Sequence, residues 1–257
     1  MTRNSLFLWA GIAMVLGLGS AADIARAAEL KVLASVALTS ALDELAPVYE
    51  KVTGDKLSIG YGLAAELKKR ILDGENADVI ILTRPMMDDL QRQDKLAADS
   101  VTNVAGTAVS VVARAGAPVP DISSVDAFKQ TLLAARSIVY ADPAKGGASG
   151  VYFAGVLNRL GLTEQLKDKT MLVPGAQAAE VVAKGEAELG VAQASEIVPV
   201  AGAKLVGPLP GELASMTVFS AGIGATSGSE APAKALIRFL TGSEAAPRLK
   251  AKGFEPG

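Results

Sequence analysis

The 257-residue sequence contains no cysteine and no histidine. Without cysteine, the chain forms no disulfide and carries no lipid on a cysteine. Without either residue type, it assembles no Ser-His-Asp or Cys-His nucleophile and no zinc site of the Cys/His kind. Carboxylate pairs and Ser-Lys pairs remain possible, but motifs such as GxSxG, SxxK and HExxH are missing. We therefore expect no metal site, no cofactor and no enzymatic activity.

Aromatic residues make up only 4% of the chain, and its formal net charge is −2. A chain with this charge and so few aromatic rings has neither the basic surface nor the stacking platforms that nucleic acids need. Half of the residues are hydrophobic, with alanine, valine, leucine and glycine dominant, a mix that suits layers of helices on sheets. After residue 27 no apolar run approaches the ~20 residues of a membrane span, so we expect no membrane insertion of the mature chain.

The N-terminus has the pattern of a secretory signal. Arg3 precedes an apolar, small-residue run over residues 5–22, and Ala25-Arg26-Ala27 offers the small-x-small pattern that a signal peptidase cleaves. A membrane anchor is the alternative, but the apolar core is short, dotted with glycine and followed at once by the cleavage pattern. We expect residues 1–27 to be a cleaved signal peptide and the mature protein to be periplasmic.

From residue 30 onward, short apolar runs alternate with amphipathic segments, which predicts an α/β fold. The segment 114–120 is rich in proline and glycine and marks a domain boundary, and the cluster 207–211 marks a return crossing. We expect two lobes joined by two crossings. Residues 28–114 and 213–257 would form lobe 1, and residues 115–212 would form lobe 2.

In open α/β sheets, ligands bind beyond the carboxyl ends of the strands. A cleft between two such lobes would therefore contact the residues that follow each predicted strand. The candidate segments are residues 35–39, 61–65, 83–84, 142–150, 174–177 and 193–195.

Several stretches, in order along residues 29–256, resemble the molybdate-binding-like solute-binding proteins of ABC importers. They are VLASVALT at 32–39, residues 67–78 leading into a hydrophobic strand, ADP at 141–143, GVY at 150–152, VAKGEAELG at 182–190 and KGF at 252–254. The resemblance implies the type II periplasmic binding protein fold, in which each lobe is a mixed sheet flanked by helices and two hinge strands join the lobes. It also implies a monomer that captures a small solute and delivers it to an inner-membrane ABC permease.

The sequence departs from this family where the ligand is selected. Molybdate and tungstate binders place a serine where this chain has Ala37, carry a serine-rich turn where it has residues 61–66, and have a tyrosine where it has Gln193. A buried tetrahedral oxoanion needs several convergent donors to replace its water. We therefore favour a different anion, although main-chain amides at helix N-termini could still bind molybdate.

The residues that follow the strands fit a small organic carboxylate. Arg84 could hold a carboxylate through two hydrogen bonds, and the glycine-rich segment 146–150 offers main-chain amides beside Ser149. The predicted ligand-binding residues are Ser35, Ala37, Tyr61, Leu63, Arg84, Ala148, Ser149, Gln177 and Gln193.

Each candidate also has a purely structural interpretation. Arg84 could pair with Asp88 or Asp89, Ser149 could cap its helix, and Tyr61 could belong to the core. Alternatives at the level of function are a molybdate or tungstate binder of the same fold, a secreted enzyme of this architecture, and a sensory domain that docks to a receptor.

Overall fold

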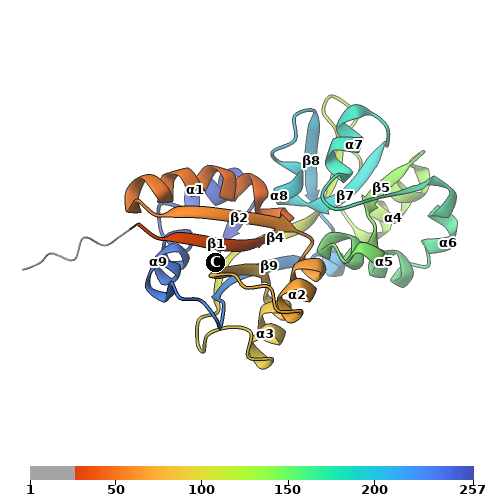
Figure 1. Cartoon of the computed structure of the whole chain (residues 1–257). Helices are drawn as coiled ribbons and strands as arrows, with labels where there is room; N and C mark the ends of the chain where they lie inside the picture. The colour runs from red at the N-terminus through yellow and green to blue at the C-terminus, as the bar shows by residue number, and fades with distance from the viewer. Residues whose placement is uncertain (1–26) are drawn as a thin grey trace, which may run out of the picture.

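A computed structural model describes residues 27–257. The predicted signal peptide therefore lies outside the described residues, apart from Ala27. Figure 1 shows two lobes side by side, with helices α1, α2, α3 and α9 in one and α4 to α7 in the other. The predicted two-lobed α/β fold is confirmed.

The first lobe is a mixed sheet between two layers of helices. Its central strands are buried on both faces because successive side chains point to opposite sides. In β3, Val79 and Ile81 face one hydrophobic core while Ile80 and Leu82 face another. Its strands are β2 (Lys56–Gly62), β1 (Glu29–Ser35), β3 (Val79–Thr83), β9 (Met216–Ile223), the first half of β4 (Thr102–Arg114) and β10 (Glu255–Pro256).

Helices of the first lobe divide between these two cores. On one face lie α1 (Thr39–Thr53), α9 (Glu230–Leu240) and α10 (Ala246–Ala251), and on the other lie α2 (Ala64–Leu72) and α3 (Arg84–Arg92). The 3-10 turn η1 (Val36–Leu38) joins β1 to α1. Strand β1 is parallel to β2 and β3, so these three strands end at the same edge of the sheet.

The second lobe repeats this layering. Strand β5 runs parallel to both β6 and β7, and β7 and β8 run antiparallel to β4. The strands are β5 (Ile138–Ala141), β6 (Thr170–Val173), β7 (Leu189–Gln193) and β8 (Ala203–Pro208). The helices are α4 (Val125–Ala134), α5 (Ala148–Arg159) and α6 (Thr163–Leu166) on one face, and α7 (Ala178–Lys184) and α8 (Ala194–Ile197) on the other. Short 3-10 turns are η2 (Pro143–Lys145), η3 (Lys167–Lys169) and η4 (Gly211–Leu213).

Strand β4 belongs to both lobes. It pairs with β9 through residues 102–108 and with β7 through residues 109–113. The chain thus crosses between the lobes inside this strand, several residues before the proline- and glycine-rich segment that the sequence indicates. At the crossing, the Thr107 hydroxyl accepts a hydrogen bond from Ser195 N–H (3.1 Å) and donates one to the Gly253 carbonyl (3.0 Å). The predicted domain limits remain a prediction.

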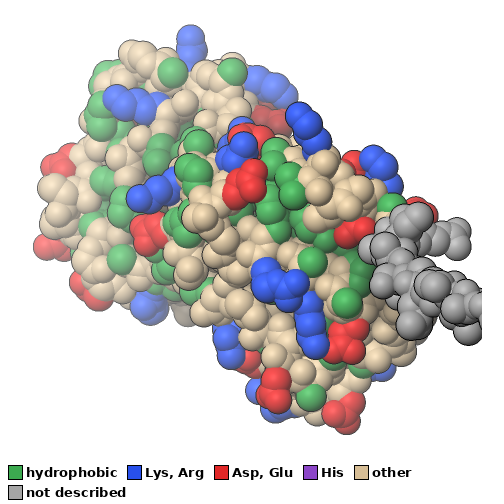
Figure 2. All heavy atoms as spheres, turned by 90° about the vertical axis from the view of Figure 1, so that its left-hand side faces the viewer, with side chains coloured by type: hydrophobic (Ala, Val, Ile, Leu, Met, Phe, Trp, Pro, Cys, Tyr) green, Lys and Arg blue, Asp and Glu red, His purple; other side chains and the backbone are tan. Residues whose placement is uncertain are grey.

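Two surface properties bear on possible partners. Across residues 27–257, no helix has the length and apolar character needed to cross a bilayer. On the face seen in Figure 2, basic and acidic side chains are interspersed among apolar ones, without a broad patch of one sign.

Helix α5 lies close against the end of β5 at Gly150. A Cβ added at Gly150 would lie 2.1 Å from the Ala141 carbonyl oxygen, so any side chain there must push the helix away. We expect Gly150→Ala to reduce the free energy of unfolding by about 1–3 kcal/mol, the usual cost of overpacking. Chemical denaturation measures this change.

Gly155 on the same helix provides the matched control. A Cβ at Gly155 meets no atom within 4 Å, and alanine is the better helix former by about 1 kcal/mol. Gly155→Ala should therefore be neutral or stabilising. Equal effects of the two substitutions would show that the contact between α5 and β5 is not tight.

Candidate functional site

A pocket lies between the lobes, where the carboxyl ends of strands from both sheets meet. Its empty volume is about 320 Å³, including the part that opens to solvent. This is the position that α/β topology assigns to ligands. Its lining from the first lobe consists of Ser35, Val36, Ala37, Leu63, Ala64 and Phe219, and that from the second consists of Ala141, Gly147, Ala148, Ser149, Gly175, Gln193 and Glu196.

Helix N-termini supply the first feature of the pocket. Leu63 and Gly147 directly precede α2 and α5, and no side chain caps either helix. Ser35 precedes η1, which leads into α1, and it also forms no capping hydrogen bond. The first N–H groups of a helix have no partner within the helix, and the helix dipole places partial positive charge on them. Main-chain amides of this kind can bind an anion.

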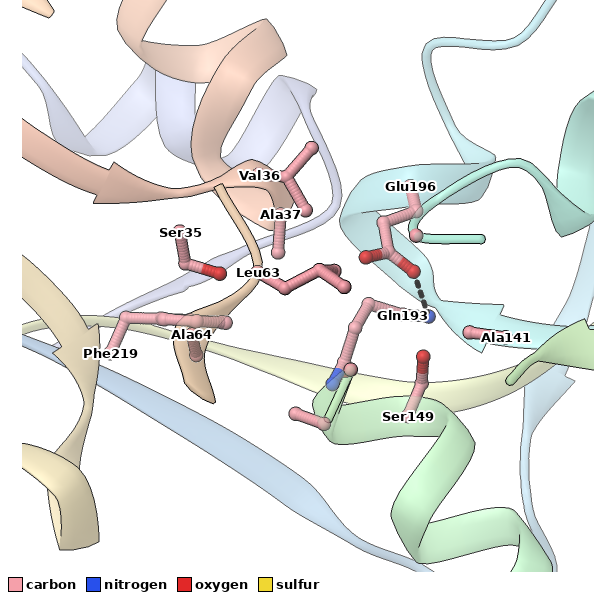
Figure 3. A pocket seen from close by; sticks show the side chains of 13 residues that line it. Ser35, Val36, Ala37, Leu63, Ala64, Ala141, Ser149, Gln193, Glu196 and Phe219 are labelled. Carbon is pink, nitrogen blue, oxygen red and sulfur yellow. Dashed lines mark hydrogen bonds between the residues drawn. The ribbon is translucent and has the colours of Figure 1, made fainter. Parts of the chain in front are cut away.

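Two serine hydroxyls add to these donors. Ser35 is 5% exposed and Ser149 is 3% exposed, and both line the pocket. Figure 3 shows their hydroxyls entering the pocket from opposite lobes. Ser149 is the second residue of α5 and does not cap it, because Gly147 holds the capping position. Its hydroxyl is thus available to a ligand.

Gln193 ends strand β7 and is 1% exposed. Its Nε2 donates to Thr217 Oγ1 (2.8 Å), which ties the second lobe to the first residues of β9. Its Oε1 is buried without a hydrogen-bond partner in the part of the chain that the structure describes. A buried acceptor left unpaired costs about 1–3 kcal/mol, so a donor on a ligand would relieve that cost.

Glu196 is the sole ionisable residue among those that line the pocket. Its Oε2 accepts a hydrogen bond from Gln193 N–H (3.1 Å), and Figure 3 shows the carboxylate facing the cavity. Burial raises the pKa of Glu196 to about 7, against a smaller opposing effect of the Gln193 N–H. The side chain therefore changes its charge near neutral pH.

Six of the nine predicted residues line the pocket, namely Ser35, Ala37, Leu63, Ala148, Ser149 and Gln193. Tyr61, Arg84 and Gln177 do not. The Tyr61 hydroxyl donates to Asp43 Oδ1 (2.7 Å), and burial, together with this carboxylate, raises the pKa of Tyr61.

Arg84 also lies outside the lining. Its side chain is 44% exposed, and its guanidinium donates to Asp88 (2.7 Å) and to Asn103 (3.1 Å). The helical spacing of Arg84 and Asp88 accounts for the first of these contacts. Gln177 is an exposed residue that precedes α7. The structure thus leaves the pocket without a cationic side chain among its lining residues.

The sequence interpretation missed Glu196. The signal that could have found it is the spacing of Gln193 and Glu196, a polar residue followed three positions later by glutamate, which is typical of a helix start. Helix α8 has only four residues, too few for helical periodicity to be visible. Within residues 27–257, no cluster of three or more Asp and Glu side chains is arranged to hold a metal ion.

A two-lobed α/β architecture with a pocket between the lobes is typical of the solute-binding class. The family described as "Bacterial extracellular solute-binding protein" matches residues 30–255, and the chain belongs to this family. The predicted resemblance to molybdate-binding-like solute-binding proteins is confirmed.

Among its relatives is a protein of a Pseudomonas species named aconitate isomerase, 35% identical over 88% of this chain and 87% of that protein. Another is the molybdate-binding protein ModA of Azotobacter vinelandii, 32% identical over 95% of this chain and 96% of that one. A solved structure of the periplasmic molybdate-binding protein of Azotobacter vinelandii superposes with a TM-score of 0.75 at 23% identity, covering 89% of this chain and 99% of the other. Because one relative is named as an isomerase, family membership does not by itself exclude catalysis.

The pKa of Glu196 has a consequence for stability. Its folded-state pKa of about 7 lies above the ordinary value of 4.5, so the folded protein holds a proton that the unfolded chain releases. The bound proton contributes to the free energy of unfolding. This contribution is complete below pH 4.5 and is lost as the pH rises through 7. Glu196→Gln removes the titration. Between pH 5 and pH 8, the free energy of unfolding of the variant should therefore rise by roughly 2–3 kcal/mol relative to that of the parent protein.

Urea denaturation of both proteins at the two pH values measures this difference. Other titrating groups are the same in both proteins and cancel in the comparison. A constant difference between pH 5 and pH 8 would show that the pKa of Glu196 is ordinary.

Proposed function

We propose that this chain is the periplasmic solute-binding component of an ABC importer and that its ligand is a small organic polycarboxylate. The proposal rests on one observation above the others. Uncapped helix N-termini and two buried hydroxyls converge on one pocket that contains no cationic side chain among its lining residues. Such a donor set binds negative charge through directed hydrogen bonds.

Glu196 is compatible with a carboxylate ligand. When Glu196 is protonated, its carboxyl group donates a hydrogen bond to a ligand carboxylate, a short and strong charge-assisted interaction. An ionised Glu196 repels any anion at close range, so the protonated form is the one that favours binding. The pKa near 7 makes both protonation states accessible under periplasmic conditions.

The comparisons support the same ligand class. A relative that is 35% identical is named aconitate isomerase, and aconitate is an unsaturated tricarboxylate. The ModA relatives support the alternative, a molybdate or tungstate binder that relies on main-chain donors. Binding of either ligand between the lobes would stabilise the closed arrangement, which the permease then recognises.

A thermal-shift screen tests the ligand class. The mature chain is heated with cis-aconitate, trans-aconitate, citrate, succinate, molybdate, tungstate or sulfate. A ligand at 100 times its Kd stabilises by about 2.7 kcal/mol, which raises the Tm of a chain of this size by roughly 5–10 °C. We expect this rise with at least one polycarboxylate. A rise with molybdate or tungstate alone would establish the alternative.

The two hydroxyls give a second prediction. Hydrogen bonds to a charged group are worth about 1.5–3 kcal/mol, so Ser149→Ala and Ser35→Ala should each weaken polycarboxylate binding by about tenfold or more. Isothermal titration calorimetry measures the affinities. Ser243→Ala, at an exposed position in the first lobe, is the matched control and should bind like the parent protein. Unchanged affinity in both pocket variants would place the ligand elsewhere.

A further inference from the structure

An acidic side chain in an anion pocket needs an explanation. Glu196 faces the cavity and has no ion-pair partner within the described chain. Only one of its oxygens, Oε2, accepts a hydrogen bond, from Gln193 N–H. Figure 3 shows the other oxygen directed into the cavity toward Leu63. This oxygen is therefore placed to meet whatever the pocket holds.

Binding alone does not require an ionisable acid at this position. A lysine or arginine would attract a polycarboxylate, and a neutral amide would donate hydrogen bonds at every pH, whereas an ionised carboxylate repels the ligand. What a glutamate offers in addition is a proton that it can release and recover. The free oxygen and the enclosed setting are what a general acid–base residue requires.

We propose that Glu196 is a catalytic acid–base residue and that the pocket isomerises a bound unsaturated polycarboxylate by a 1,3-proton shift. This inference rests on the proposed function, because it requires an organic polycarboxylate as the ligand. The substrate class is defined by chemistry: a carbon–carbon double bond next to a methylene group that carries a carboxylate. Aconitate is the simplest tricarboxylate of this class.

The step balances without a cofactor. The Glu196 carboxylate removes a proton from the methylene carbon, and the electron pair of that C–H bond forms a new double bond to the central carbon. The electrons of the old double bond move to the far carbon, which takes the proton from the Glu196 carboxyl group. The double bond has moved by one position and can now have either geometry. No oxidant, reductant or leaving group is needed.

The pocket can stabilise the charge that develops in this step. Removal of the proton spreads negative charge over the three-carbon unit and its carboxylates. Uncapped amides at the starts of α2 and α5 line the same cavity as Glu196. Fixed dipoles directed at developing charge in an enclosed site are the largest common source of catalysis. Glu196 also has a pKa near 7, which suits proton transfer in both directions at neutral pH.

Charged groups on the neighbouring elements do not account for the properties of Glu196. Strands β4, β7 and β8 and the turn η1 pack against α8. Arg114 and Lys204 lie near the end of β4 that is remote from the pocket, and Lys252, beside the Gly253 contact with α8, is paired with Glu44. None of these groups contributes to the pKa shift, which arises from burial.

A structural role is the competing explanation, because Glu196 also accepts the Gln193 N–H at the start of α8. Glu196→Gln separates the two roles. The glutamine Oε1 still accepts this hydrogen bond and keeps the size of the side chain, but it cannot carry a proton between carbons. Glu164→Gln provides the matched control, since the Glu164 side chain is 86% exposed on the same lobe.

The experiment follows trans-aconitate by proton NMR in deuterated buffer with the purified mature chain. Isomerisation appears as cis-aconitate, and the exchange of the Glu196 proton with solvent appears as deuterium at the methylene and vinylic carbons. We expect both signals with the parent protein and with Glu164→Gln. We expect a loss of at least about 100-fold with Glu196→Gln, the usual contribution of a general acid–base residue, while calorimetry shows that the variant still binds trans-aconitate.

The outcomes separate this inference from the proposed function. If the parent protein binds polycarboxylates but produces neither isomer nor deuterium exchange, the catalytic proposal is wrong and the binding proposal stands. The catalytic proposal is equally wrong if Glu196→Gln reacts as fast as the parent. If the parent binds no polycarboxylate, the proposed function itself fails.

The pH dependence supplies a second readout that a structural role would not produce. Affinity for trans-aconitate should fall as the pH rises from 6 to 8, because the ionised Glu196 repels the ligand. Turnover of the bound complex should rise over the same range, because only the ionised form removes a proton. Glu196→Gln should abolish the first trend. Parallel trends of affinity and turnover in the parent protein would overturn the assignment.

Discussion

The pocket presents main-chain amides and hydroxyls, and no cationic side chain is among its lining residues. This constraint follows from topology, because parallel strands in each lobe end at the edge that faces the other lobe. Helices α2 and α5 begin at this edge without a side-chain cap, so their first N–H groups have no partner within the helix. Small residues at these helix starts, such as Ala64 and Gly147, leave the amides accessible. The donor set is therefore a property of the backbone, and side chains are left to select among anions.

Glu196 acquires its importance from this arrangement. Partial charges at helix ends amount to about half an elementary charge each, so they do not balance a full negative charge as an arginine would. A single carboxyl group among them changes the electrostatics of the whole pocket when it gains or loses a proton. Its Oε2 is held by Gln193 N–H, and Gln193 is in turn held by Thr217 of β9. The orientation of the carboxylate thus depends on a strand of the first lobe as well as on its own helix.

Much of this structure could be predicted from the sequence, and each prediction that failed did so for an identifiable physical reason. The helical spacing of residues 64–72, followed by Asp73-Gly74, predicts a helix with these bounds, and α2 spans Ala64–Leu72. The strand-end rule located Ser35, Ser149 and Gln193 because it depends only on where strands stop. Arg84 also directly follows a strand, yet its side chain donates hydrogen bonds to Asp88 and Asn103. A sequence does not show which rotamer a side chain adopts. Glu196 was missed because a four-residue helix has no periodicity to detect.

Burial links the chemistry of Glu196 to the relative position of the lobes. The rise of its pKa from 4.5 to about 7 is caused mainly by partial removal of the carboxylate from water. A movement of the lobes that opens the pocket returns water to the carboxylate and lowers its pKa toward the ordinary value. Thermodynamic linkage then requires that protonation of Glu196 favours the closed arrangement by the same free energy. A ligand that encloses Glu196 and a proton that neutralises it therefore act in the same direction.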